Sequence, residues 1–242
     1  MQIESRVYPG LEPLSRDAAD FIVGAAREAI DQRGLFTVAI SGGKSPKRLY
    51  ELLGEKNYAS QIRWNATHLF WADERAVPPS HSASNFGMTQ NMLSQVPISS
   101  ANIHRMHGER DPLSEAATDY ENAIRLTVPP VASGGPPAFD LVLLGLGADG
   151  HTASLFPNDP LLEEKTKLVA AVQKPAGIPP VPRITMTFPC LNQARTALFL
   201  VSGVSKRPIV NEILQDRAAA ANKYPAARIA AQERTVWFVS ET

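Results

Sequence analysis

The stretch FDLVLLG (residues 139–145) decides the fold class, because it is almost uninterrupted apolar sequence ending in a glycine-rich turn. An all-apolar strand of this kind is typical of a parallel sheet that is covered on both faces. The preceding segment PPVASGGPP (residues 129–137) is a predicted loop and a possible domain boundary. Because the strand after it fits one continuous sheet, we instead expect a single α/β domain over residues 1–242.

Helices and strands alternate on both sides of this segment. Apolar stripes of helical period predict helices over residues 15–33, 45–53, 85–94 and 113–128. Ser45 and Ser114 are the expected N-caps of the second and fourth of these helices. Short apolar or β-branched runs predict further strands at residues 35–40, 67–72, 102–106, 168–172, 184–188, 197–201 and 236–239. The alternation predicts a doubly wound, Rossmann-like α/β fold of three layers, α/β/α, with a mostly parallel sheet and helices on both faces.

The composition excludes several classes of protein. The 242 residues include 24 Lys and Arg against 24 Asp and Glu, so the formal net charge is zero. A general nucleic-acid or membrane-surface binder carries a basic patch, so we expect a small-molecule partner, no nucleic acid and no membrane. No apolar run approaches the roughly 18 residues of a membrane span and no leader pattern is visible, which favours a cytoplasmic location. Cys190, the single cysteine, is predicted to be a buried, reduced core residue.

Ligands of doubly wound folds bind at the carboxyl ends of the strands, so the loops after residues 40, 72, 145 and 201 are the candidates. The first, SGGKS (residues 41–45), ends like a P-loop, but Val38 stands where the P-loop pattern has its first glycine. What remains is Gly42, Gly43 and Lys44 before a helix N-terminus, which favours an anion such as a phosphate. A tight turn without a ligand is the alternative.

The loop GLGADG (residues 145–150) matches the dinucleotide-binding pattern G-x-G-x-x-G. That pattern opens a long helix, whereas HTASLF (residues 151–156) leaves less than two helical turns before Pro157. We therefore expect no dinucleotide. His151 is instead a candidate general base, since a glycine-rich loop presents it at a strand end and imidazole titrates near neutral pH. A hydrogen-bonded structural histidine is the alternative.

Charged residues occupy the other two loops and one strand start. Asp73, Glu74 and Arg75 follow the strand predicted at residues 67–72, and a solvated loop is their alternative interpretation. Arg183 precedes one predicted strand and Lys206 follows another, and each by itself is an ordinary surface cation. Together with the SGGKS turn, the two cations would form a clamp for a phosphate.

Six motifs together resemble those of the 6-phosphogluconolactonases. They are SGGKSP (41–46), FWADERAVP (70–78), SNFGMTQNMLS (84–94), GLGADGHTASLFP (145–157), PRITMT (182–187) and SGVSKRP (202–208), and the resemblance covers essentially the whole chain. It implies hydrolysis of 6-phospho-D-glucono-1,5-lactone to 6-phosphogluconate in the oxidative pentose phosphate pathway, without a metal or other cofactor. It also implies an α/β scaffold similar to that of glucosamine-6-phosphate deaminases.

Carried over by position, the resemblance implies roles for individual residues. The catalytic histidine falls on His151, and the acidic-arginine loop falls on Asp73, Glu74 and Arg75. The implied phosphate and substrate contacts come from Gly42, Gly43, Lys44, Arg183 and Lys206. Family members often carry acidic residues where this chain has His-Ser-Ala at residues 81–83, which leaves the contribution of the loop at residues 81–85 open.

The chemistry of a lactone agrees with this set of residues. An activated ester needs a positioned water, a base for its proton and groups that stabilise an oxyanion. His151 would be the base, with either Asp149 or Asp73 orienting it. An acyl-enzyme route is disfavoured because neither Ser41 nor Ser154 lies in a G-x-S-x-G elbow.

Two other functions remain as alternatives. Glucosamine-6-phosphate deaminases follow the histidine with a Phe-Asn-Glu-Pro-like segment, whereas residues 153–157 here are Ala-Ser-Leu-Phe-Pro. A non-catalytic sugar-phosphate sensor would need the clamp but not His151. The five histidines and one cysteine show no metal-ligand spacing, so no metal site is expected. The sequence does not determine the oligomeric state; a monomer is expected, with a homodimer as the alternative.

Overall fold

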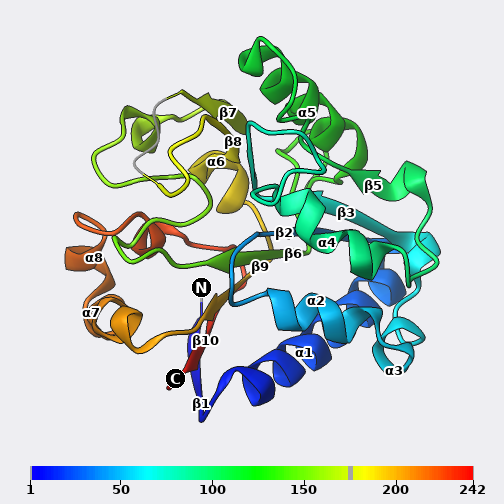
Figure 1. Cartoon of the computed structure of the whole chain (residues 1–242), viewed down its shortest axis with the longest axis horizontal. Coiled ribbons are helices and arrows are strands. Elements are labelled where there is room, and N and C mark those ends of the chain that lie inside the picture. Colours follow the sequence, from blue (N-terminus) through cyan, green and yellow to red (C-terminus); the bar gives the residue numbers. More distant parts are fainter. Residues whose placement is uncertain (1, 174–176, 242) are drawn as a thin grey trace.

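The central sheet is parallel throughout and has seven strands. The computed structural model describes residues 2–173 and 177–241. In spatial order the strands are β1 (Gln2–Tyr8), β10 (Arg234–Ser240), β9 (Thr196–Val201), β6 (Leu141–Gly145), β2 (Phe36–Ile40), β3 (Thr67–Trp71) and β5 (Ile103–His104). The predicted apolar strand β6 thus lies in the middle of the sheet (Figure 1).

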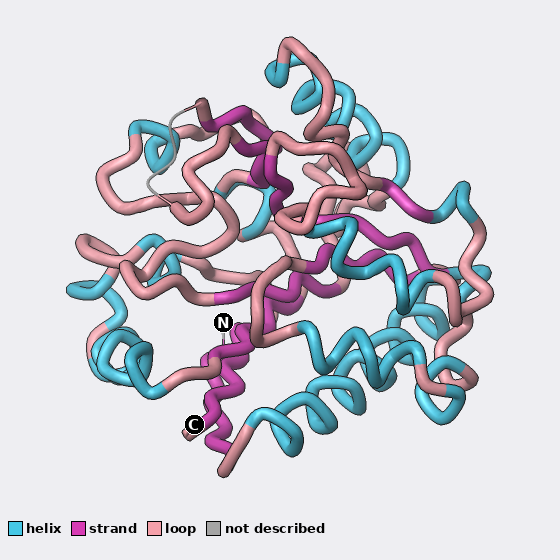
Figure 2. Tube along the Cα trace, viewed as in Figure 1, coloured by secondary structure: helices cyan, strands magenta, loops and turns pink. Residues whose placement is uncertain are grey.

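Helices cover both faces of this sheet. They are α1 (Leu11–Arg33), α2 (Lys47–Gly54), α3 (Lys56–Ala59), α4 (Asn85–Leu93), α5 (Leu113–Thr127), α6 (Phe188–Leu191), α7 (Arg207–Gln215) and α8 (Arg217–Ala220). Short 3-10 helices are η1 (Trp64–Ala66), η2 (Ser100–Asn102), η3 (Pro160–Glu163), η4 (Val204–Lys206) and η5 (Pro225–Arg228). Figure 2 shows α1 and α2 on one side of the strands and α5 on the other.

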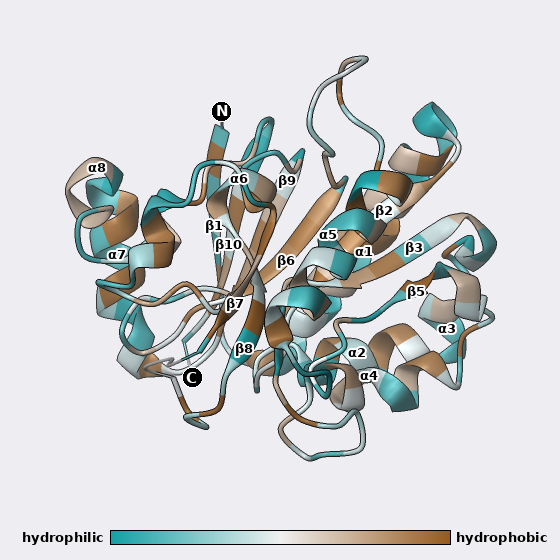
Figure 3. Cartoon of the chain, turned by 90° about the horizontal axis from the view of Figure 1, so that it is seen from above, coloured by the Kyte–Doolittle hydropathy of each residue, from teal (hydrophilic) through white to brown (hydrophobic). Residues whose placement is uncertain are grey.

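The alternation of side chains along β6 explains why the strand is apolar on both faces. Leu141 and Leu143 belong to a hydrophobic cluster with α1 and α2, whereas Val142 and Leu144 belong to a second cluster with α5 and α7. In Figure 3 the central strands are mostly apolar, while the helices carry polar residues on part of their surface. The predicted doubly wound, three-layer fold is therefore confirmed.

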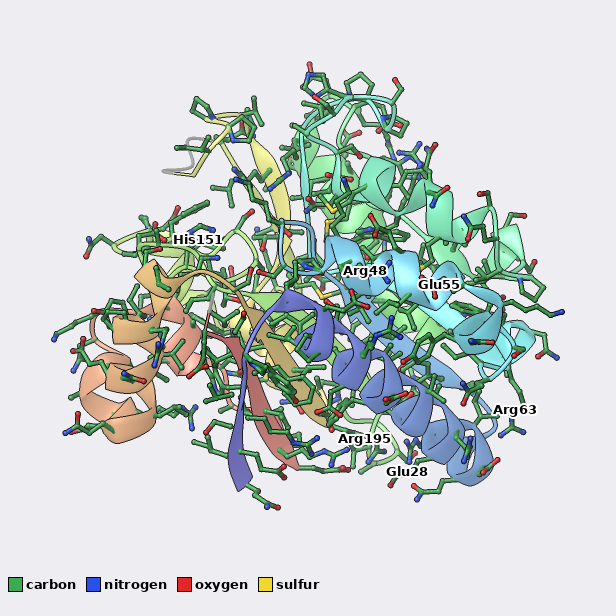
Figure 4. The ribbon with its side chains drawn as sticks, turned by 60° about the horizontal axis from the view of Figure 1, so that its bottom comes forward. Glu28, Arg48, Glu55, Arg63, His151 and Arg195 are labelled. Atoms are coloured by element: carbon green, nitrogen blue, oxygen red, sulfur yellow. The ribbon has the colours of Figure 1, made fainter. Side chains whose placement is uncertain are left out.

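Asp140 is the polar residue that interrupts the apolar stretch, and its carboxylate forms hydrogen bonds and ion pairs within the fold. Its carboxylate accepts hydrogen bonds from the Thr37 backbone N–H at 2.7 Å and the Arg33 Nε at 2.9 Å. Arg195, labelled in Figure 4, lies 3.7 Å away from the same carboxylate. These groups meet at the amino ends of the strands, away from the loops in which a ligand is expected.

The expectation of one continuous sheet was wrong for two strands. Residues near 168–172 and 184–188 form β7 (Val169–Val172) and β8 (Arg183–Met186), which pair antiparallel with each other and with β4 (Asp73–Arg75) in a separate three-stranded sheet. Parallel neighbours need a crossover segment that is usually a helix, whereas the sequence between β7 and β8 is rich in proline. The chain therefore returns antiparallel, and Phe188 begins α6 rather than ending a strand.

Three smaller predictions also differ from the structure. The edge strand β1 was not predicted, because its sequence QIESRVY is largely polar and exposed. Ser45 does not cap α2; its hydroxyl lies 2.7 Å from that of Ser202, and the helix begins at Lys47. Ser114 does not cap α5 either, since the helix already begins at Leu113. Among the described residues no helix is both long and apolar enough to cross a membrane.

Cys190 is buried, as predicted. Burial also raises the pKa of its thiol to about 12, which keeps the group protonated and unreactive.

Candidate active site

A polar pocket opens at the carboxyl ends of the central strands. Its wall combines the loops after β2 and β6 with residues from β4, β8 and η4. Eight of the nine predicted site residues line it: Gly42, Gly43, Lys44, Asp73, Arg75, His151, Arg183 and Lys206. The ninth, Asp149, stands directly behind His151. The structure thus brings together residues that are far apart in the sequence.

The turn after β6 presents His151, labelled in Figure 4, and holds it by one carboxylate. Asp149 Oδ1 accepts a hydrogen bond from the His151 backbone N–H at 3.1 Å and lies 2.5 Å from His151 Nδ1. Because a carboxylate only accepts, Nδ1 carries the hydrogen in the neutral tautomer of the ring, which leaves the lone pair on Nε2. Although partial burial by itself raises the pKa of Asp149, the hydrogen bonds from His151 lower it overall.

Glycines make this arrangement sterically possible. Gly150 has φ +81°, a left-handed conformation that favours glycine. A Cβ on Gly147 would lie 2.1 Å from His151 Nδ1, so the imidazole packs directly against the glycine backbone. The ring also packs against Phe156, with 4.7 Å between the ring centroids. The position of His151 therefore depends on small neighbours as much as on Asp149.

Asp73 is fixed by partners other than His151. Its Oδ1 accepts a hydrogen bond from Asn85 Nδ2 at 3.0 Å and its Oδ2 accepts one from Ser154 Oγ at 2.7 Å. Arg183 Nη1 lies 3.9 Å from the same Oδ2. Of the two carboxylates that were candidates to orient His151, the structure therefore brings Asp149, and not Asp73, into contact with it.

Glu74 is turned away from the pocket and stabilises the start of α4. Its buried carboxylate accepts hydrogen bonds from the backbone N–H groups of Arg75, Asn85 and Phe86 and from the Ser84 hydroxyl, at 2.7–2.9 Å. Burial raises the pKa of this carboxyl group, and these hydrogen bonds oppose the rise. Negative charge at a helix N-terminus is favourable, so a structural role explains Glu74.

The loop at residues 81–85 positions Arg75. The Arg75 Nη1 donates to the Ala83 carbonyl oxygen at 2.6 Å, while the Ala83 N–H donates to His81 Nδ1 at 3.0 Å. Arg75 Nε is buried and has no hydrogen-bond partner among the described residues. This chain thus uses a histidine-containing turn to orient the guanidinium toward the pocket.

Lys44, Arg183 and Lys206 also line the pocket. Burial lowers the pKa of Lys206, and the nearby charge of Lys44 lowers it further. Arg183 is 2% exposed, and burial lowers its pKa too. Its Nη2 donates to the Pro179 carbonyl at 3.0 Å, whereas its buried Nε lacks a partner in the described part of the chain. Incompletely paired cations of this kind provide a site for an anion.

The SGGKS turn is held in place from two sides. A Cβ on Gly42 would lie 1.7 Å from Asn85 Oδ1, so this glycine lets the Asn85 side chain approach the turn. On the other side, the Ser45 hydroxyl lies 2.7 Å from the Ser202 hydroxyl and accepts a 3.3 Å hydrogen bond from the Ser202 backbone N–H. Ser202 precedes Lys206 in the loop after β9. The contact therefore joins the loop that carries Lys44 to the loop that carries Lys206, and these two lysines form a cation cluster.

Sequence reasoning missed Asn85 and the contact made by Ser154. Both residues lie in motifs that had been singled out. Asn85 is 12 positions from Asp73 in the sequence and Ser154 is 81 positions from it, and both form hydrogen bonds with its carboxylate. No local pattern reports such a contact. The described residues contain no group of three or more His, Cys, Asp or Glu side chains that could hold a metal ion.

The fold and this pocket define a member of one family of sugar-phosphate proteins. The family model described as glucosamine-6-phosphate isomerases/6-phosphogluconolactonase matches residues 10–237, and the chain belongs to that family.

Two curated relatives and one crystal structure that are similar to this chain are 6-phosphogluconolactonases. A 6-phosphogluconolactonase from Synechocystis is 43% identical over 216 residues, which are 88% of this chain and 85% of the relative. One from Nostoc is 36% identical and covers 96% and 93% of the two chains. The crystal structure of 6-phosphogluconolactonase from Thermotoga maritima has a TM-score of 0.85 at 31% identity, covering 99% of this chain and 100% of that one. A monomeric glucosamine-6-phosphate deaminase, 18% identical with a TM-score of 0.78, shares the fold.

Proposed function

We propose that the protein is a 6-phosphogluconolactonase, which hydrolyses 6-phospho-D-glucono-1,5-lactone to 6-phosphogluconate in the oxidative pentose phosphate pathway. The observation that carries the proposal is the pairing of His151 Nδ1 with Asp149 in a pocket that also contains Lys206 and Arg183. A base and an anion site in one pocket suit a phosphorylated ester. Relatives of 36–43% identity that bear this name support the same activity.

The phosphate of the substrate occupies the cationic side of the pocket. Lys44 and Lys206 supply charge, the Gly42–Gly43 turn allows close backbone approach, and the Arg183 guanidinium adds a further positive charge to the pocket wall. Charge-assisted hydrogen bonds of this kind are the strong ones in proteins. Binding energy from the phosphate aligns C1 of the lactone with the base.

Hydrolysis begins with a water molecule between His151 Nε2 and C1. His151 takes a proton from the water as its oxygen attacks the C1 carbonyl, and Asp149 stabilises the imidazolium that forms. The Arg75 guanidinium stabilises the oxyanion of the tetrahedral intermediate. As the bond between C1 and the ring oxygen breaks, His151 returns the proton to that oxygen. No metal ion, cofactor or covalent enzyme intermediate takes part.

Asp73 acts on the substrate and on its neighbours rather than on His151. Fixed by Asn85 and Ser154, its carboxylate accepts a hydrogen bond from a sugar hydroxyl and keeps Arg183 oriented. Pre-organisation of this kind lowers the entropy that binding must remove.

The alternatives fit the pocket less well. Ring opening with aldose–ketose proton transfer needs additional carboxylates, and residues 153–157 of this chain carry none. A sensor has no use for a histidine whose tautomer is fixed by a carboxylate. We propose that the enzyme acts in the cytoplasm on a free sugar phosphate, as one domain, with no nucleic-acid or membrane partner.

A lactone-hydrolysis assay with freshly prepared substrate, corrected for spontaneous hydrolysis, tests the proposal. Purified protein is expected to hydrolyse the 6-phosphate lactone and to release no ammonia from glucosamine 6-phosphate. The His151→Asn variant, purified in parallel, controls for a contaminating enzyme. Hydrolysis at the spontaneous rate, or turnover of glucosamine 6-phosphate, would contradict the proposed function.

A further inference from the structure

The outer edge of β1 is a long, regular row of unpaired backbone groups. Within residues 2–173 and 177–241, β1 lies at one end of the central sheet and pairs only with β10, whereas the strand at the other end, β5, has two residues. The Gln2 N–H donates to the Glu233 carbonyl and the Tyr8 carbonyl accepts from the Glu241 N–H. In a parallel strand, alternate residues bond to the same neighbour. The N–H and C=O groups of Ile3, Ser5 and Val7 therefore point outward.

This edge carries one usual protection against pairing with another chain, the charged residues Glu4 and Arg6, but it lacks three others. Edge strands of monomers are commonly short, bulged or interrupted by proline, and β1 is a continuous seven-residue strand without proline. Ile3 and Val7, on the same face, are 42% and 61% exposed. Glu4 and Arg6 lie on the opposite face, where Arg6 pairs with Asp17 of α1.

The sequence of β1 is complementary to itself in one antiparallel register. With Ser5 opposite Ser5 of a second copy, Ile3 lies opposite Val7 and Glu4 lies opposite Arg6, each pair occurring twice by symmetry. In this register the outward-pointing residues are also those that face each other, so each of their pairs exchanges N–H···O=C bonds. Opposite charges and aliphatic side chains opposite one another both stabilise strand pairs.

We propose that β1 is the interface of a two-fold symmetric homodimer, in which two central sheets join through antiparallel β1 strands into one continuous sheet. A second copy of this chain is favoured over other partners because the charge pairing and the aliphatic pairing both hold in a single self-complementary register. The homodimer, and not the monomer expected from the sequence, is then the assembly in solution. None of the β1 residues lines the pocket, so association leaves the proposed active site open.

Charge reversal tests the register. Glu4→Arg places like charges opposite each other in both symmetry-related pairs, and so does Arg6→Glu. Each variant is expected to weaken self-association roughly tenfold to a hundredfold. When the two variants are mixed, the charges across the interface again have opposite signs, and a heterodimer is expected. Glu115→Arg, an exposed reversal on α5, is the matched control and is expected to leave association unchanged.

Sedimentation velocity from about 1 μM to about 1 mM measures these equilibria. The unaltered chain is expected to reach twice the 26.3 kDa monomer mass, and Ser5→Pro, which removes an outward N–H and adds a bulky ring, is expected to remain monomeric. Lactone hydrolysis per chain is expected to be unchanged in all variants, which reports that they fold. A monomer throughout this range, a dimer that survives Ser5→Pro, or single variants that fail to associate on mixing would overturn the proposal.

Discussion

Asp149 Oδ1 lies 2.5 Å from His151 Nδ1, so the ring nitrogen that faces away from the carboxylate is the one left with a lone pair. The two residues are separated by Gly150, whose positive φ turns the chain so that one side chain can reach the other. A base oriented within a three-residue turn needs no distant residue to set its tautomer.

Replacing His151 by Asn is expected to lower kcat by about 10² to 10⁴, the usual contribution of a general base. KM should change little, because the phosphate contacts remain. Steady-state kinetics on the 6-phosphate lactone provide the measurement. His107→Asn is the control, since His107 is exposed and outside the pocket. If His151→Asn kept more than about a third of the original kcat, His151 would not be the base.

Gly147→Ala tests the steric requirement at the same site. The added Cβ would lie 2.1 Å from His151 Nδ1, so the imidazole must move, and a shift of about 1 Å can reduce the rate about 10²-fold. Gly24→Ala is the matched control, because a Cβ in the middle of α1 meets nothing within 4 Å. That change should leave kcat unaltered and raise the melting temperature slightly. Equal kcat values for the two variants would contradict the close packing of His151 on Gly147.

Lys206→Ala is expected to reduce kcat/KM for the phosphorylated lactone roughly tenfold to a hundredfold, because a charge-assisted contact contributes about 1.5–3 kcal/mol. Unphosphorylated gluconolactone has no group for this lysine to bind, and its kcat/KM should not change. Lys165→Ala, at an exposed lysine outside the pocket, is the control. Equal losses with both substrates would mean that Lys206 acts on something other than the phosphate.

Dialysis against EDTA is expected to leave the hydrolysis rate unchanged. The proposed mechanism uses an imidazole base and a guanidinium in the roles that a metal-bound hydroxide and a Lewis acid would otherwise fill. Rates are compared before dialysis, after it, and after zinc or magnesium is added back. Activity that disappears with the chelator and returns with a metal would contradict the mechanism.

The free energy of unfolding is expected to decrease as the pH is lowered from about 6.5 to about 4, because of His104. Burial and the neighbouring His68 lower the pKa of His104 to about 4, so over this interval the unfolded chain binds a proton that the folded protein does not. His104→Phe retains a ring to stack on Phe70, whose centroid is 4.3 Å away, and removes the titration. The drop in melting temperature from pH 7 to pH 4 should shrink by roughly 5 °C in this variant. Parallel melting curves for the two proteins would contradict the assignment.

The sequence predicted the central layer of the fold and the residues of the pocket for a physical reason. Strands buried on both faces must be apolar, so β6 can be recognised from the sequence. Loops that hold an anion or present a base must be rich in glycine and charge, so the turn around His151 can be recognised as well. The small sheet was not predicted, because β7 is as apolar as a core strand, β8 is just as buried although it contains Arg183 and Thr185, and only the connection between the two strands sets their direction. The hydrogen bonds to Asp73 could not be predicted for another reason, because they depend on contacts that exist only after the sheet has formed.

The Ser45–Ser202 contact has a consequence for how the protein matures. It joins residues 157 positions apart, from the loops after β2 and β9, and the cation cluster is complete only when both loops are in place. A nascent chain whose β9 has not yet been synthesised contains Lys44 but not Lys206, the second lysine of the cluster. In the proposed phosphate site, a sugar phosphate therefore cannot stabilise the early translation product, and it begins to select the native state only when most of the polypeptide has been synthesised.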